Sequence, residues 1–137
     1  MHDFFAEKLL YMHQLNRMWI QLYVQNVDDV PDAIAVRFSM LINNQHLWQA
    51  CIAQKEAEIE LEDRLPQYSW EALENDNYRI WQEILDGLYA ESAERQHQIC
   101  SVIFQAMQEN ARNLGVLRYL CEDVELPVPN EQFVPLN

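Results

Sequence analysis

Four histidines are the side chains best suited to bind a metal ion or to transfer a proton: His2, His13, His46 and His97. A histidine metal site on one helix needs two ligands four residues apart. No two of these histidines have that spacing, so they do not predict such a site. We interpret His13 and His46 as residues that support or cap other groups, and we expect His2 and His97 to be exposed.

The other reactive side chains carry no local signature. A di-iron bundle needs Glu-x-x-His on each of two helices, and the sequence does not have two such helices. We therefore interpret most carboxylates as a solvated surface. The three cysteines, Cys51, Cys100 and Cys121, are too widely spaced for a zinc knuckle or a disulfide framework. We expect them to be buried, unreactive thiols in a reducing, cytoplasmic compartment.

A polar run at residues 108–113 interrupts the apolar stripe of the last predicted helix. Asn110 and Asn113 fall within the stripe, and Glu109 lies at its edge. Buried polar side chains need hydrogen-bond partners. Two interpretations are open: a wet end of the bundle or a subunit contact, and a polar pocket or the remnant of one.

The elements that must position these residues are helices. Apolar residues recur every three or four positions over about 3–25, 31–53, 69–90 and 92–124. Ser69 and Ser92 are predicted N-caps for the third and fourth helices. The connection at 54–68 is long, with a short helical turn predicted within 55–63, and the proline-containing tail after Val124 should lie extended against the helices. This pattern predicts one all-α domain over residues 1–137, a four-helix bundle whose long connection permits an up-down-down-up arrangement.

The charge excludes several partners. Nine basic against 22 acidic residues give a net charge of −13, which argues against nucleic acid and against an anionic membrane surface. Residues 54–94 hold 12 acidic and 3 basic residues, a net −9, and we expect this acidic face to point to solvent. The longest uncharged stretch, residues 38–54, contains six Asn, Gln and His residues, so it predicts a buried helix and not a membrane span.

Four segments resemble the DinB-like (DinB/YfiT) superfamily of bacterial four-helix bundles. Residues 11–17 are similar to a first-helix pattern of tyrosine followed by Asn-Arg, and residues 38–48 to a second-helix pattern that ends in tryptophan. Residues 103–121 resemble the fourth-helix segment that normally reads His-x-x-x-His-x-Gly. Residues 126–133 resemble a proline-containing tail with an aromatic end.

The resemblance implies an up-down-down-up bundle, often dimeric, in which three histidines bind a divalent metal for thiol transfer or hydrolysis. The matching positions here are Met40, Glu109 and Asn113; a slip of one residue would replace the last two by Gln108 and Arg112. All three histidines are therefore missing in either register. A thioether and two hard oxygen ligands match no common metal site, and without a cation the activation of water or thiolate is lost.

These observations lead to a functional hypothesis. We expect a metal-free bundle without cofactor or enzyme activity that acts as a binding or interaction module and forms a homodimer. One alternative is a transferase or hydrolase with atypical ligands, whose polar pocket would draw on Gln108, Arg112, His13 and His46 beside the matching positions. Another is a binder of a small apolar ligand in the same cavity.

Overall fold

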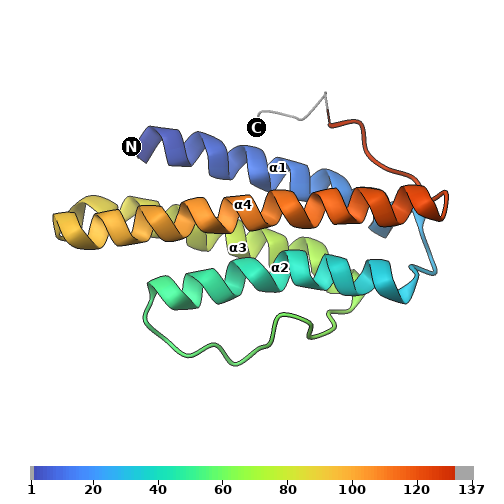
Figure 1. The fold of residues 1–137 in the computed structure, drawn as a ribbon, viewed down its shortest axis with the longest axis horizontal. Helices are drawn as coiled ribbons and strands as arrows, with labels where there is room; N and C mark the ends of the chain where they lie inside the picture. The colour runs from blue at the N-terminus through green and yellow to red at the C-terminus, as the bar shows by residue number, and fades with distance from the viewer. Residues whose placement is uncertain (1, 132–137) are drawn as a thin grey trace.

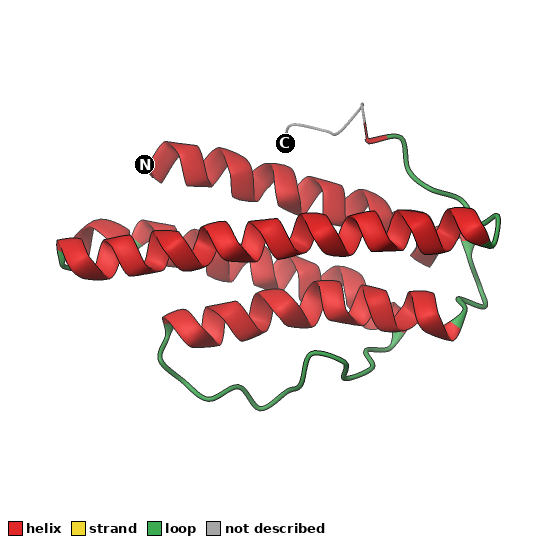
Figure 2. Ribbon diagram, viewed as in Figure 1, coloured by secondary structure: helices red, strands yellow, loops and turns green. Residues whose placement is uncertain are grey.

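The chain folds into a bundle of long helices (Figures 1 and 2). A computed structural model describes residues 2–131, and in this range it has four α-helices, two short 3-10 helices and no strand. The α-helices are α1 (His2–Asn26), α2 (Asp32–Ile52), α3 (Trp70–Asp86) and α4 (Ala93–Asp123), and the 3-10 helices are η1 (Gln67–Ser69) and η2 (Leu88–Ala90). The predicted all-α class is confirmed. None of the helices within residues 2–131 has the length and apolarity that crossing a membrane requires.

The helices pack as two close pairs. α4 packs most closely on α2, and α1 packs most closely on α3, while α2 also contacts α3 and α1 contacts α4. After α2 the chain returns along most of the length of α2 before α3 begins (Figure 1). This return is the long connection that the sequence predicts.

Two apolar clusters form the core, and a polar layer separates them. One cluster contains large residues of all four helices, among them Trp19, Phe38, Trp70 and Leu117. The other cluster is built around Leu9, Ile52, Trp81 and Ile103. On every helix, buried polar residues lie between the members of the two clusters: His13 and Asn16; Asn43, Asn44, Gln45 and Gln49; Glu74 and Asn77; Asn110 and Asn113.

Residues 55–63 of the connection between α2 and α3 form no helix. The predicted helical turn is limited to one hydrogen-bonded turn, in which the Asp63 amide donates to the Glu60 carbonyl oxygen at 3.2 Å. The side chain of Asn43 donates hydrogen bonds to the carbonyl oxygens of Leu61 at 3.2 Å and Asp63 at 2.8 Å. The Leu65 amide donates to the Ser39 hydroxyl at 3.0 Å. These bonds hold the connection against α2. Residues 55–63 are also too few to form a stable helix without tertiary contacts.

The caps of the last two helices differ from each other. Ser92 caps α4 as predicted, because its hydroxyl accepts the Arg95 amide at 3.1 Å. Ser69 precedes α3 but does not cap it, since its hydroxyl bonds the Pro66 carbonyl oxygen at 2.6 Å instead. α3 also ends at Asp86, before the predicted boundary, and the chain continues through Gly87 into η2.

The C-terminal tail lies against α1 and α4 as far as Glu131. Trp19 Nε1 donates to Glu131 Oε1 at 2.9 Å, and Arg118 Nη2 donates to the Pro129 carbonyl oxygen at 3.1 Å. The prediction of a docked tail is confirmed for this part of the chain. Phe133, the aromatic residue of the tail motif, lies outside the described residues.

The cysteines only partly follow the prediction. Cys100 and Cys121 are buried, but Cys51 is exposed because it lies on the outer side of the last turn of α2. The Tyr23 hydroxyl lies 2.7 Å from Cys121 Sγ and donates to the Pro127 carbonyl oxygen at 2.9 Å. Burial raises the pKa of the Cys121 thiol, and burial together with this thiol raises the pKa of Tyr23 well above its ordinary value of 10.0.

The Tyr23–Cys121 pair should make the fold sensitive to alkali. Both groups stay protonated in the folded chain at pH values where the unfolded chain ionises them. The unfolded state therefore binds fewer protons, and the free energy of unfolding should fall by about 1–2 kcal/mol between about pH 8 and pH 11. Urea unfolding across this range measures the slope. Tyr23→Phe should flatten it, whereas Tyr119→Phe, a change at an exposed tyrosine, should not; equal slopes in both variants would contradict the assignment.

Candidate functional site

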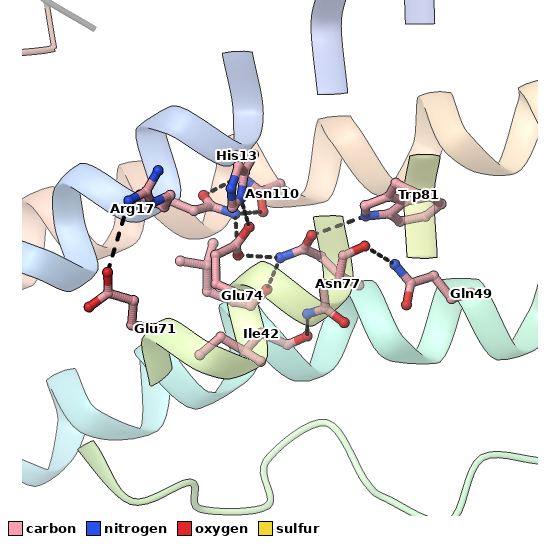
Figure 3. Close-up of polar contacts among 12 residues, drawn as sticks. His13, Arg17, Ile42, Gln49, Glu71, Glu74, Asn77, Trp81 and Asn110 are labelled. Carbon is pink, nitrogen blue, oxygen red and sulfur yellow. Dashed lines mark hydrogen bonds and ion pairs between the residues drawn. The ribbon is translucent and has the colours of Figure 1, made fainter. Parts of the chain in front are cut away.

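A fully buried carboxylate lies at the centre of the polar layer. Glu74 of α3 is 0% exposed. Its Oε2 lies 2.8 Å from His13 Nδ1, and its Oε1 accepts Asn16 Nδ2 at 3.0 Å and Gln45 Nε2 at 2.8 Å. Figure 3 shows the Glu74 side chain pointing toward His13 on α1. One carboxylate thus takes hydrogen bonds from both α1 and α2.

The hydrogen bonds extend from Glu74 to the fourth helix and along the core. Asn16 and Asn110 bond each other reciprocally, side chain to side chain, at 3.0 and 2.9 Å. Trp81 Nε1 donates to Gln45 Oε1 at 3.0 Å. All four helices are therefore joined by one buried set of hydrogen bonds: His13, Asn16, Gln45, Glu74, Trp81 and Asn110.

We call these six residues the buried polar network. Their donors and acceptors match, since every amide oxygen accepts from an N–H and the carboxylate receives three bonds. A buried carboxylate that loses its partners costs several kcal/mol, while a fully bonded one costs little. The network therefore favours the one packing of the helices in which all of its bonds form.

The imidazole of His13 is covered on one side by a tyrosine ring. The rings of His13 and Tyr78 stack with centroids 4.2 Å apart and planes 7° apart. Burial raises the pKa of the Tyr78 phenol. Tyr78 also lines a groove of about 380 Å³ with Leu9 and Arg79, so its ring stands between that groove and His13.

A histidine oriented by a carboxylate is one half of a general-base arrangement, which also needs a nucleophile within hydrogen-bond distance of the ring. Within residues 2–131, no Ser, Thr or Cys side chain is hydrogen-bonded to His13. The arrangement can hold and orient a proton between Nδ1 and Oε2. It does not present an activated nucleophile.

The positions that match the family's metal site are already paired with other side chains. Glu109 Oε2 accepts Trp48 Nε1 at 2.7 Å, and Asn113 Oδ1 accepts Arg37 Nη1 at 3.2 Å. Met40 is half-buried on α2. In the part of the chain that the structure describes, no three His, Cys, Asp or Glu side chains are grouped so that they could hold a metal ion.

Of the sequence-predicted pocket residues Gln108, Arg112, His13 and His46, only His13 is buried. His13 and Asn110 join the buried polar network, but Gln108, Arg112 and His46 are exposed. His46 lines a separate groove beside the connection after α2. His97 is exposed as expected, whereas His2 is half-buried near Asp86.

Glu74 is the residue that the sequence analysis missed. It belongs to the acidic segment 54–94, which was expected to face solvent, and that expectation is wrong at this position. The sequence does contain a pattern that indicates burial of Glu74. The buried stripe of α3 is formed by residues at helical spacing: Trp70, Glu74, Asn77 and Trp81. A carboxylate between two buried tryptophans on such a stripe predicts a bonded, buried group.

Comparison of the chain with protein-family models, curated proteins and solved structures finds no match.

Replacing Glu74 should destabilise the fold strongly. Glu74→Ala leaves the donors on His13, Asn16 and Gln45 without an acceptor, so the free energy of unfolding should fall by about 3–5 kcal/mol. Glu74→Gln keeps the shape and one acceptor oxygen and should cost less. Urea unfolding followed by circular dichroism measures both.

The matched control is Asp76→Ala, a carboxylate on the exposed side of the same helix. It should change stability by less than about 1 kcal/mol. A Glu74→Ala variant as stable as this control would show that the network does not hold the bundle together.

Proposed function

We propose that this chain is a divergent, metal-free DinB-like bundle that acts as a non-catalytic interaction module. The observation that carries this proposal is the pairing at the family's metal position. Glu109 is bonded to Trp48 and Asn113 to Arg37. Side chains engaged in this way are not free to form a ligand set for a catalytic metal.

The course of the helices supports the family assignment. In Figure 1, α1 and α4 run from left to right, and α2 and α3 run from right to left. The close pairs α1/α3 and α2/α4 then consist of helices that run in opposite directions. This order favours an up-down-down-up arrangement, and the long connection between α2 and α3 is what lets these two helices run the same way.

The surface of α1 and α4 supports the interaction role. Phe4 and Tyr11 of α1 are 48% and 49% exposed, and Phe104 of α4 is 48% exposed. These helices are neighbours in the bundle. Most acidic residues of the segment 54–94 lie in the connection and α3, so the α1/α4 face is less charged. A face that meets its own copy must avoid like charges, and for this reason we propose that the α1/α4 face forms a homodimer.

The proposal predicts that this chain binds no divalent metal, unlike the catalytic members of the family. Protein purified without an affinity tag should contain no stoichiometric divalent metal by elemental mass spectrometry. Glu109→Ala should leave metal content unchanged and cost about 1 kcal/mol of stability, because the Trp48 indole N–H loses its acceptor. One bound metal per chain, lost in Glu109→Ala, would contradict the proposal and favour a transferase or hydrolase with atypical ligands.

The proposed homodimer leads to a second prediction. Light scattering should give the wild-type chain twice its mass of 16.3 kDa. Tyr11→Lys and Phe104→Lys place like charges opposite each other, and each should weaken the dimer by about 2 kcal/mol, roughly thirtyfold. Tyr68→Lys, at a tyrosine that is 87% exposed on η1, is the control and should leave the dimer intact. A monomeric wild-type chain, or equal effects of all three changes, would exclude this face.

A further inference from the structure

The C-terminal tail is held on the bundle in the way that a binding groove holds an extended peptide. It leaves α4 after Asp123 and crosses toward α1 (Figure 1). Residues 126–130 have no regular secondary structure. Three side chains of α1 and α4 bind the tail, and we call them the tail seat: Trp19, Tyr23 and Arg118.

The seat binds backbone carbonyl oxygens at alternate residues of the tail. The Tyr23 hydroxyl donates to the Pro127 carbonyl oxygen at 2.9 Å, and Arg118 Nη2 donates to the Pro129 carbonyl oxygen at 3.1 Å. Because proline has no N–H, neither proline brings a backbone donor that the bundle would have to satisfy. Prolines also favour an extended backbone before binding, so less conformational entropy is lost on the seat.

The seat also binds side chains of the tail. Leu126 and Val128, which alternate with the prolines, pack against the apolar cluster that contains Trp19. The Glu131 carboxylate accepts Trp19 Nε1 at 2.9 Å and lies 3.2 Å from Arg118 Nη2. The Arg118 guanidinium lies 5.6 Å from the centroid of the Trp19 ring. The bound pattern is therefore two apolar residues, each followed by a proline, and then a carboxylate.

The turn that joins α4 to the tail carries a conformational cost. The Leu126 amide donates to the Cys121 carbonyl oxygen at 2.8 Å and the Glu125 amide to the Glu122 carbonyl oxygen at 3.1 Å, the pattern of a Schellman motif. This motif places Glu125 at a φ of 58°, in the left-handed region that favours glycine. A separate peptide does not need this turn. The cost therefore opposes docking of the tail but not docking of a peptide.

We propose that the tail seat is a binding site for an extended segment of another protein, and that the tail occupies this site as a competing ligand in cis. The partner segment has prolines at alternate positions, an apolar residue before each proline, and a carboxylate two residues after the second. Aromatic surfaces that bind proline-containing extended segments are a general mode of peptide recognition.

The tail seat is distinct from the surface of the proposed homodimer. Trp19, Tyr23 and Arg118 lie in the second halves of α1 and α4, whereas Phe4 and Phe104 lie in the first halves. The proposal gives the interaction module a partner of defined chemistry. It does not rest on the homodimer or on the metal content of the chain, so the tests of those properties leave it unaffected.

Fluorescence anisotropy with a labelled, amidated hexapeptide, Leu-Pro-Val-Pro-Asn-Glu, tests the proposal. The hexapeptide has the sequence of residues 126–131. It is added to the full wild-type chain and to Glu131→Lys, which sets a lysine beside Arg118 and should displace the tail. Because apparent affinity falls with the fraction of open seats, Glu131→Lys should bind the peptide at least about tenfold more tightly than the wild type.

A second peptide tests recognition of the carboxylate. The same hexapeptide with glutamine in place of glutamate should bind Glu131→Lys about tenfold more weakly, because its amide forms no ion pair with Arg118. Equal affinity of the two peptides would overturn the proposal. The absence of saturable binding to Glu131→Lys, or equal affinity of wild type and Glu131→Lys for the first peptide, would overturn it too.

Substitutions in the Glu131→Lys background locate the site. Arg118→Gln should weaken peptide binding at least about tenfold, since it removes the cation of the seat. Arg79→Gln of α3 is the matched control, because Arg79 and Arg118 each pair with a glutamate four residues further on. It should bind the peptide as its background does. Circular dichroism confirms that each variant is folded, and equal peptide binding by the two folded variants would contradict the proposed site.

Discussion

The buried carboxylate of Glu74 is the group on which the arrangement of the helices depends. Its three hydrogen bonds come from side chains of α1 and α2, and one of these, Asn16, also donates a hydrogen bond to Asn110 of α4. The apolar clusters on either side of this layer could be filled by other packings of similar residues, because apolar contacts are not directional. Hydrogen bonds are directional, so a helix that slides or rotates breaks them and leaves buried groups without partners. The network therefore selects one register for all four helices.

The proposed lack of a metal site rests on the same layer of the bundle. A metal site needs ligands that are free to converge on a cation, whereas the side chains here are bonded to one another across helices. Glu109 and Asn113 pair with α2, and Asn110 pairs with α1. Under the proposed function, polar side chains inside the bundle support its structure, and recognition takes place on its outer surfaces. The α1/α4 face, with the exposed rings of Phe4, Tyr11 and Phe104, is the surface that this proposal assigns to a second copy.

Much of the fold could be predicted from residue patterns, and much less of the site. The helical stripes located α1, α2 and α4 to within a few residues, and the Ser92 cap and the docked tail followed from local chemistry. His13 and Asn110, which belong to the network, were recognisable from the sequence as candidate site residues. Glu74 was not, because its carboxylate was grouped with its acidic neighbours, and His46 was expected in a pocket although α2 turns that residue outward. Ser69 failed as a cap because Pro66 offered its hydroxyl a nearer acceptor.

By itself, the sequence determined the properties that act over short distances along the chain: four helices, their apolar stripes, most of their ends and a net charge of −13. Only the tertiary structure decided which polar residues meet. Glu74 lies 61 residues from His13 and 58 from Asn16, and Asn16 lies 94 from Asn110. Helical periodicity places each of these side chains on a buried face, but it does not specify the partner across the core. That choice depends on how the helices rotate and slide against one another, which is settled only when all four pack together.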